Sequence, residues 1–141
     1  MSIFWKKKVI YTSPIKALSN QKFQEFSNKF PDIDIGILTG DIKHNPGAQL
    51  LIMTTEILQN HCFKVQSGNQ QLDFDIDLEN ELGSVIFDEV HYIDDVDRGT
   101  VWEQTIIMLP DHIPFVMLSA TIGKKENFSW FNCSSWGNLS I

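Results

Sequence analysis

Short apolar runs recur along the chain and alternate with helical patterns, and this alternation constrains the fold more than any other feature. The runs place Val, Ile, Leu and Phe on consecutive positions, which is typical of strands covered on both faces of a parallel sheet. Apolar residues recur at helical spacing in residues 17–30 and 100–109, and Pro31 and Pro110 follow these two stretches. The alternation predicts an α/β domain. The expected strands are residues 9–14, 33–40, 49–56, 84–89 and 114–121.

Every expected strand ends in polar residues. In open parallel sheets, functional groups gather at the carboxyl ends of the strands, because those ends lie along one edge. A single polar ending has an ordinary explanation, since polar residues cap strands, but the same ending on every strand favours a shared ligand-binding edge. The endings are Thr12 and Ser13, Thr39 and Gly40, Thr54 to Glu56, Asp88 and Glu89, and Ser119 to Thr121.

The ending at Asp88 and Glu89 carries the strongest chemical signal. A carboxylate at the end of a parallel strand can hold Mg²⁺, usually through water, where the ion also meets nucleotide phosphates. A second carboxylate can orient or deprotonate an attacking water, and His91 lies close enough in sequence to sense the site. The bare acidic pair also fits a helix N-terminus that uses acids to complement its dipole. The neighbouring motifs favour the metal hypothesis.

Charge and cysteine content exclude several classes of protein. The chain has 141 residues, enough for one domain, and a formal net charge of −7. Its overall field therefore disfavours polyanions, and any nucleic-acid contact needs a local basic patch or backbone amides. Five of the 11 basic residues lie within the first 22 positions, so such a patch is possible there. Two distant cysteines favour an intracellular, reducing setting, and no apolar run approaches a membrane span.

Residues 73–82 are expected to form a solvated acidic loop, because aspartates occupy alternate positions from Asp73. A calcium loop that starts at Asp73 would need Gly at its sixth position and Glu at its twelfth. Leu78 and Ser84 stand there, which excludes that class of site.

Five motifs, in order along the chain, resemble those of superfamily-two DExH-box helicases. "DEVH" (88–91), preceded by "VIF", resembles motif II, and "LSATI" (118–122) resembles motif III. "YTSPIKALSNQKF" (11–23) resembles motif Ia, while "LTGD" (38–41) and "MTTEIL" (53–58) resemble the next two nucleic-acid-contacting motifs. The longer strings "FDEVHYIDDVDRGTVWEQTIIMLP" and "GILTGDIKHNPGAQLLIMTTEIL" are similar specifically to superkiller-type RNA helicases, which serve the RNA exosome.

The resemblance implies a RecA-like parallel sheet with flanking helices, and an ATP-dependent RNA helicase that couples ATP hydrolysis to RNA unwinding. It implies that Asp88 holds the Mg²⁺ of ATP, that Glu89 positions the hydrolytic water, and that His91 links this site to motif III. Ser119 and Thr121 would join that link through their hydroxyls. The implied partners are single-stranded RNA and the RNA exosome or its adaptor proteins, in the nucleus or cytoplasm. The implied RNA path consists of Ser13, Pro14, Lys16, Thr39, Gly40, Thr54 and Thr55.

Hydroxyls, glycine and backbone amides suit a phosphate track that is read without sequence preference. For each of these RNA-path residues taken alone, a turn or cap is the more common role. The set as a whole favours the RNA path.

The phosphate-binding pattern GxxxxGK[ST] does not occur in the sequence. Gly123 and Lys124 form the only Gly-Lys pair, but Leu118 and Lys125 stand where the pattern needs Gly and Ser or Thr. In the family that the motifs resemble, this loop lies upstream of motif Ia, and a second RecA-like domain completes the site. We therefore expect an incomplete sheet and no ATP hydrolysis by these residues alone. The expected parts are an extension at 1–8, a partial ATP-binding domain at 9–130 and a divergent tail at 131–141.

Two other functions remain open from the sequence. The first is a catalytically dead RNA- or protein-binding module derived from a helicase, which RNA binding without ATP binding would favour. The second is a small α/β metal-dependent regulator in which Asp88 takes a phosphate or Mg²⁺. That class needs a Lys at the end of a late strand, and Lys124 lies only loosely there, so it ranks last.

Overall fold

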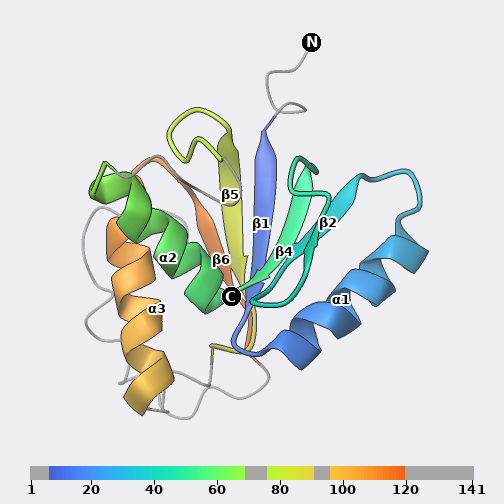
Figure 1. Cartoon of the computed structure of the whole chain (residues 1–141), viewed down its shortest axis with the longest axis horizontal. Helices are drawn as coiled ribbons and strands as arrows, with labels where there is room; N and C mark the ends of the chain where they lie inside the picture. The colour runs from blue at the N-terminus through green and yellow to red at the C-terminus, as the bar shows by residue number, and fades with distance from the viewer. Residues whose placement is uncertain (1–6, 69–75, 91–95, 120–141) are drawn as a thin grey trace.

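The computed structural model describes residues 7–68, 76–90 and 96–119. These residues form one sheet of six strands in the order β3-β2-β4-β1-β5-β6, with helices on both faces (Figure 1). All neighbouring strands pair in parallel except β3, which is antiparallel to β2. The elements are β1 (Lys8–Ser13), α1 (Lys16–Lys29), β2 (Ile35–Leu38), β3 (Lys43–His44), β4 (Leu50–Thr54), α2 (Thr55–Gln66), β5 (Leu82–Phe87), α3 (Val96–Met108) and β6 (Phe115–Met117).

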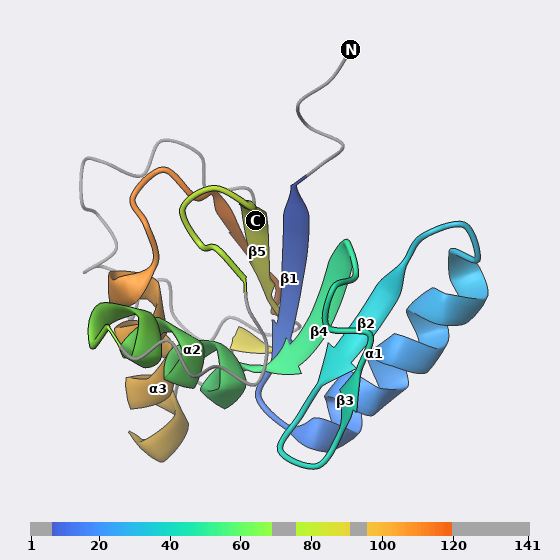
Figure 2. The same cartoon turned by 45° about the horizontal axis from the view of Figure 1, so that its top comes forward.

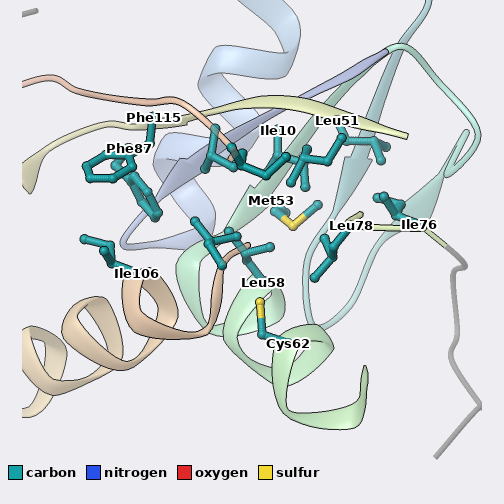
Figure 3. Packing of buried hydrophobic residues seen from close by; sticks show 14 of the residues in the cluster. Ile10, Leu51, Met53, Leu58, Cys62, Ile76, Leu78, Phe87, Ile106 and Phe115 are labelled. Carbon is teal, nitrogen blue, oxygen red and sulfur yellow. The ribbon is translucent and has the colours of Figure 1, made fainter. Parts of the chain in front are cut away.

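The helices divide the core into two parts. Helix α1 covers one face of the sheet, while α2 and α3 lie side by side on the other (Figure 2). Successive residues of a strand point to opposite faces, so Ile10 enters the larger core beneath α2 and α3, and Tyr11 enters the smaller core beneath α1. Figure 3 shows the larger core, in which Leu58 and Cys62 of α2 meet the sheet residues Leu51 and Met53.

The predicted α/β class and the five predicted strands are confirmed; β2, β4 and β6 are shorter than expected, while β1 and β5 have the expected length and begin one and two residues earlier. Two elements escaped the sequence pattern. Helix α2 begins at Thr55, where a strand is expected to continue to Glu56; the buried residues Leu58 and Cys62 have helical spacing. Strand β3 is two residues long and exposed, so no apolar pattern marks it. Among the described helices, none is long and apolar enough to span a membrane.

In the described part of the acidic loop predicted at 73–82, the acidic residues are exposed as predicted, but the apolar residues between them are buried. Ile76 and Leu78 are buried in the larger core, while Asp77 between them is exposed and accepts hydrogen bonds from two backbone amides of the next turn. The segment therefore alternates between core and solvent, because its apolar residues belong to the same core cluster as Leu58 and Cys62 of α2. Asp73 and Asp75 lie outside the described residues.

Replacing Gly36 by alanine is expected to lower the free energy of unfolding by about 1–3 kcal/mol or more, because overpacking strains a filled site. A Cβ atom at Gly36 would overlap the backbone oxygen of Asn45 and come within 2.9 Å of Leu51 Cδ2. Urea denaturation of the chain measures the change. Gly47→Ala is the matched control, since its Cβ would meet nothing within 4 Å; equal losses in both variants would contradict the packing account.

Candidate functional site

The polar strand endings meet along one edge of the sheet, as the sequence predicts. Ser13 pairs with Thr54 at the ends of β1 and β4. Leu38, the last residue of β2, pairs with Met53 of β4, so β2 ends at the same edge. On the other side, Asp88 follows the end of β5, and its backbone amide donates to the Thr12 carbonyl at 2.9 Å. Residues that are far apart in the sequence therefore form one continuous polar edge.

Asp88 is half-buried, and both of its carboxylate oxygens are already engaged. The Tyr11 hydroxyl donates to Oδ2, and the backbone amide of Glu89 donates to Oδ1 at 2.9 Å. Burial, together with the adjacent Asp88 carboxylate, raises the pKa of Tyr11 well above its usual range. The Tyr11 hydroxyl therefore stays protonated at neutral pH and acts as the donor.

Glu89 has a left-handed backbone conformation, with φ of 58°. For a residue other than glycine this conformation costs about 1–3 kcal/mol and is concentrated at functional sites. Its neighbours fix it: the Leu118 amide donates to the Phe87 carbonyl at 2.8 Å, and the Val90 amide donates to the Leu118 carbonyl at 3.0 Å. Val90, directly after the acidic pair, lies in a 3₁₀ turn, and α3 starts at Val96.

The oxygen ligands at this edge suit Mg²⁺. Within the ranges that the structure describes, no three His, Cys, Asp or Glu side chains lie together as a metal site. An ion at Asp88 would take its other ligands from phosphate and water, which is how Mg²⁺ commonly binds, through one or two carboxylates and substrate phosphates. Asp88 is thus a fitting ligand, and the half-buried Glu89 lies beside it.

The hydroxyls of the predicted RNA path mostly face inward. Ser13 Oγ lies 2.6 Å from Ser19 Oγ and 3.2 Å from the Ile15 carbonyl oxygen, and Thr55 Oγ1 donates to the Ser13 carbonyl at 3.3 Å. These hydroxyls are buried, as is the side chain of Thr54. They join β1, α1 and α2, and these three residues expose almost none of their surface, backbone included.

In a second group of path residues, Lys16 and Gly40 are exposed and Thr39 is buried. Thr39 closes a tight turn, because its amide donates to the Ile42 carbonyl at 2.9 Å and its hydroxyl accepts from the Ile42 amide at 3.2 Å. The turn exposes Gly40 and Asp41. Lys16, at the start of α1, lies over this turn: its Nζ is 2.6 Å from Asp41 Oδ2, and its Cε would be 3.5 Å from a Cβ at Gly40.

The remaining predicted residues are only partly described. Pro14 is half-buried between β1 and α1, and Ser119 is half-buried beyond β6. His91 and Thr121 lie outside the described residues, so their roles stay predictions. Sequence reasoning missed Tyr11 and Asp41 as members of the site, although both stand inside the recognised motifs. Their partners, Asp88 and Lys16, are distant in sequence, and a local pattern does not reveal such contacts.

A solved structure of similar shape shows the fold. The crystal structure of the DUF1998 helicase MrfA bound to DNA and AMPPNP matches 86% of this chain and 18% of that chain, with a TM-score of 0.58 and 20% sequence identity. This likeness confirms the predicted RecA-like α/β sheet.

Sequence relatives show the family. The antiviral helicase SKI2 of Saccharomyces cerevisiae is 48% identical over 135 residues, which is 95% of this chain and 10% of SKI2. The exosome RNA helicase MTR4 of Homo sapiens is 47% identical over 128 residues, 91% of this chain and 11% of MTR4. The ATP-dependent RNA helicase mtr4 of Schizosaccharomyces pombe is 49% identical over 124 residues, 88% of this chain and 10% of that protein.

The chain thus spans about a tenth of the length of these curated relatives. The family model for the DEAD/DEAH box helicase matches residues 3–128, nearly the whole chain. The motif order, the sheet and the relatives agree, and the chain belongs to the DEAD/DEAH box helicase family.

Proposed function

We propose that this chain forms part of the ATP-binding lobe of an RNA helicase that couples ATP hydrolysis to RNA unwinding. One observation carries the proposal: motifs Ia, II and III meet at one edge of the sheet. Asp88 bonds to the end of β1 through the Thr12 carbonyl, and Val90 bonds to Leu118 after β6. The names of the relatives, ATP-dependent and exosome RNA helicases, support RNA as the substrate and the RNA exosome or its adaptors as partners.

In this proposal, Asp88 and Glu89 have different roles at the nucleotide: Asp88 holds the metal ion and Glu89 acts on the attacking water. Mg²⁺, when bound, neutralises charge that develops on the transferred phosphate. Asp88 holds that ion from a carboxylate whose orientation is already fixed by two donors. Glu89 orients the attacking water and accepts its proton on a carboxylate oxygen. The left-handed backbone at Glu89, with φ of 58°, is the kind of strain that is concentrated at functional sites and supports this role.

RNA, in the same proposal, follows the exposed turn at Gly40 and the start of α1. Lys16 supplies a positive charge there, and the glycine lets a phosphate approach the backbone closely. Asp41 faces the same Lys16 ammonium at 2.6 Å, so a bound phosphate has to compete with the Asp41 carboxylate for this charge.

Replacing Asp41 by asparagine is therefore expected to tighten RNA binding about two- to fivefold at low salt, since exposed ion pairs are worth ~0.2–1 kcal/mol. Lys16→Ala is expected to weaken binding and to reduce the slope of log affinity against log salt by about one. Fluorescence anisotropy of the chain with a labelled single-stranded oligonucleotide measures both effects.

Asp32→Asn is the matched control for this test, because it removes the same charge from an exposed position on the loop that leads to β2. An equal gain in affinity from Asp32→Asn and Asp41→Asn would contradict competition at Lys16 and would indicate a general charge effect. No RNA binding by the unmutated chain would contradict the proposed RNA path itself.

A second candidate function is an RNA-binding module that does not hydrolyse ATP. The exposed Lys16 and Gly40 fit it, because they offer a positive charge and an open backbone to a phosphate whether or not ATP is hydrolysed. RNA affinity that does not change when ATP and Mg²⁺ are added, together with no nucleotide binding by the chain, would support this candidate.

A further inference from the structure

Tyr11 has an unusual place for a polar group, because it lies inside the central strand β1 and keeps only 4% of its surface exposed. Its hydroxyl nevertheless reaches Asp88 Oδ2, a residue 77 positions away. The register explains the contact. Tyr11 pairs with Ile86 of β5, and Asp88 lies two residues beyond Ile86, on the same face of the sheet.

The aromatic ring of Tyr11 is itself held in place. Its edge meets the ring of Phe26 in α1, with centroids 5.2 Å apart and planes at 89°. Ile35 and Ile52 complete the small core around it. Several neighbours thus hold the ring, and Phe26 is only one of them.

The Asp88 carboxylate thus has one donor on each oxygen: the Tyr11 hydroxyl on Oδ2 and the Glu89 amide on Oδ1 at 2.9 Å. Each carboxylate oxygen can accept more than one bond, so each retains capacity for a cation or for a water bound to it. Two donors at fixed positions define the plane of the carboxylate and remove its freedom to rotate.

We propose that Tyr11 is a positioning residue for Asp88, which orients this carboxylate before a divalent cation binds. The inference rests on the proposed function, in which Asp88 holds the Mg²⁺ of the nucleotide. Immobilising a side chain on binding costs free energy, and the Tyr11 hydroxyl removes this cost in advance. Removal of this hydroxyl should weaken cation binding about three- to tenfold, while the chain stays folded.

The test uses Mn²⁺ as the probe and the full 141-residue chain. Mn²⁺ broadens the NMR signals of nearby amides, so titration of the Glu89 amide signal gives an apparent affinity at Asp88. Tyr11→Phe is expected to weaken this affinity three- to tenfold, and Asp88→Asn to abolish it. Phe26→Leu removes the ring that packs on Tyr11 but keeps the hydroxyl, and it is expected to leave Mn²⁺ affinity within a factor of two.

The outcomes separate this inference from the proposed function. Normal Mn²⁺ affinity in Tyr11→Phe, with binding that still depends on Asp88, overturns the positioning role alone. Equal weakening by Phe26→Leu also overturns it, since packing would then be the cause. No Mn²⁺ broadening at Glu89 in the unmutated chain overturns the metal role of Asp88, and this inference with it.

A second measurement keeps the inference testable if Tyr11→Phe does not fold. The chain has two tyrosines, so labelling with 3-fluorotyrosine gives two ¹⁹F signals, and Tyr92→Phe identifies the signal of Tyr11. We expect this signal to shift in Asp88→Asn and on addition of saturating Mg²⁺ to the unmutated chain. A Tyr11 signal that responds to neither change overturns the positioning role.

Discussion

Glu89→Gln is expected to lower RNA-stimulated ATP hydrolysis about 10²–10⁴-fold, the usual contribution of a positioned acid-base group. The reaction would be measured in a graft, in which residues 9–119 of this chain replace the aligned segment of the Schizosaccharomyces pombe ATP-dependent RNA helicase mtr4. Glutamine keeps the size of the side chain and tolerates the left-handed backbone of Glu89 no worse than glutamate does. The lost activity would therefore report the carboxylate itself.

Two control measurements on the graft show whether the lost activity is specific to the Glu89 carboxylate. RNA affinity is expected to stay within a factor of two in Glu89→Gln, because the proposed RNA contacts lie at Lys16 and Gly40. Glu56→Gln makes the same chemical change at an exposed position in the first turn of α2 and is expected to keep full activity. Retention of more than a tenth of the turnover in Glu89→Gln would contradict the assigned role.

Trp102→Ala is expected to lower the free energy of unfolding of the chain by about 3–5 kcal/mol. Trp102 lies on α3 with 1% of its surface exposed, and its ring packs on Phe87 with centroids 4.6 Å apart. Small domains are stable by only about 5–15 kcal/mol, so this one substitution should remove much of the total. Urea denaturation followed by circular dichroism measures the change.

Two controls separate core packing from a general effect on α3. Ile107→Ala lies on the same helix with 77% of its surface exposed and is expected to change stability by less than about 0.5 kcal/mol. Trp102→Phe keeps an aromatic ring and removes an indole N–H that has no hydrogen-bond partner among the described residues. It should therefore lower the free energy of unfolding clearly less than Trp102→Ala does. Equal losses in Trp102→Ala and Ile107→Ala would contradict the account.

The sequence predicts the fold class because buried parallel strands leave a strong local signature. Val, Ile and Leu on consecutive positions mark β1, β4 and β5, and the polar residue after each strand marks the shared edge. The predicted strand 49–56 runs two residues past the true end of β4 at Thr54, for a local reason. Thr54 and Thr55 suit a strand end as well as a helix start, and Glu56 serves as the first-turn acid of α2.

The contacts within the site depend on register, which local patterns do not encode. The link between Tyr11 and Asp88 exists because β1 and β5 pair with a particular alignment. The inward turn of the Ser13 and Thr55 hydroxyls likewise depends on how α1 and α2 meet the strand ends. Residue types could thus be assigned to the edge from sequence, whereas their orientation could not.

The measurement that tests the central claim most directly is ATP hydrolysis by the unmutated graft in mtr4, with and without single-stranded RNA. The account predicts turnover within about tenfold of the parent helicase, stimulated by RNA and lost in Asp88→Asn, because Asp88 is assigned to the metal that hydrolysis requires. A graft that folds and binds RNA but hydrolyses no ATP would contradict the claim that this edge of the sheet is a working helicase site.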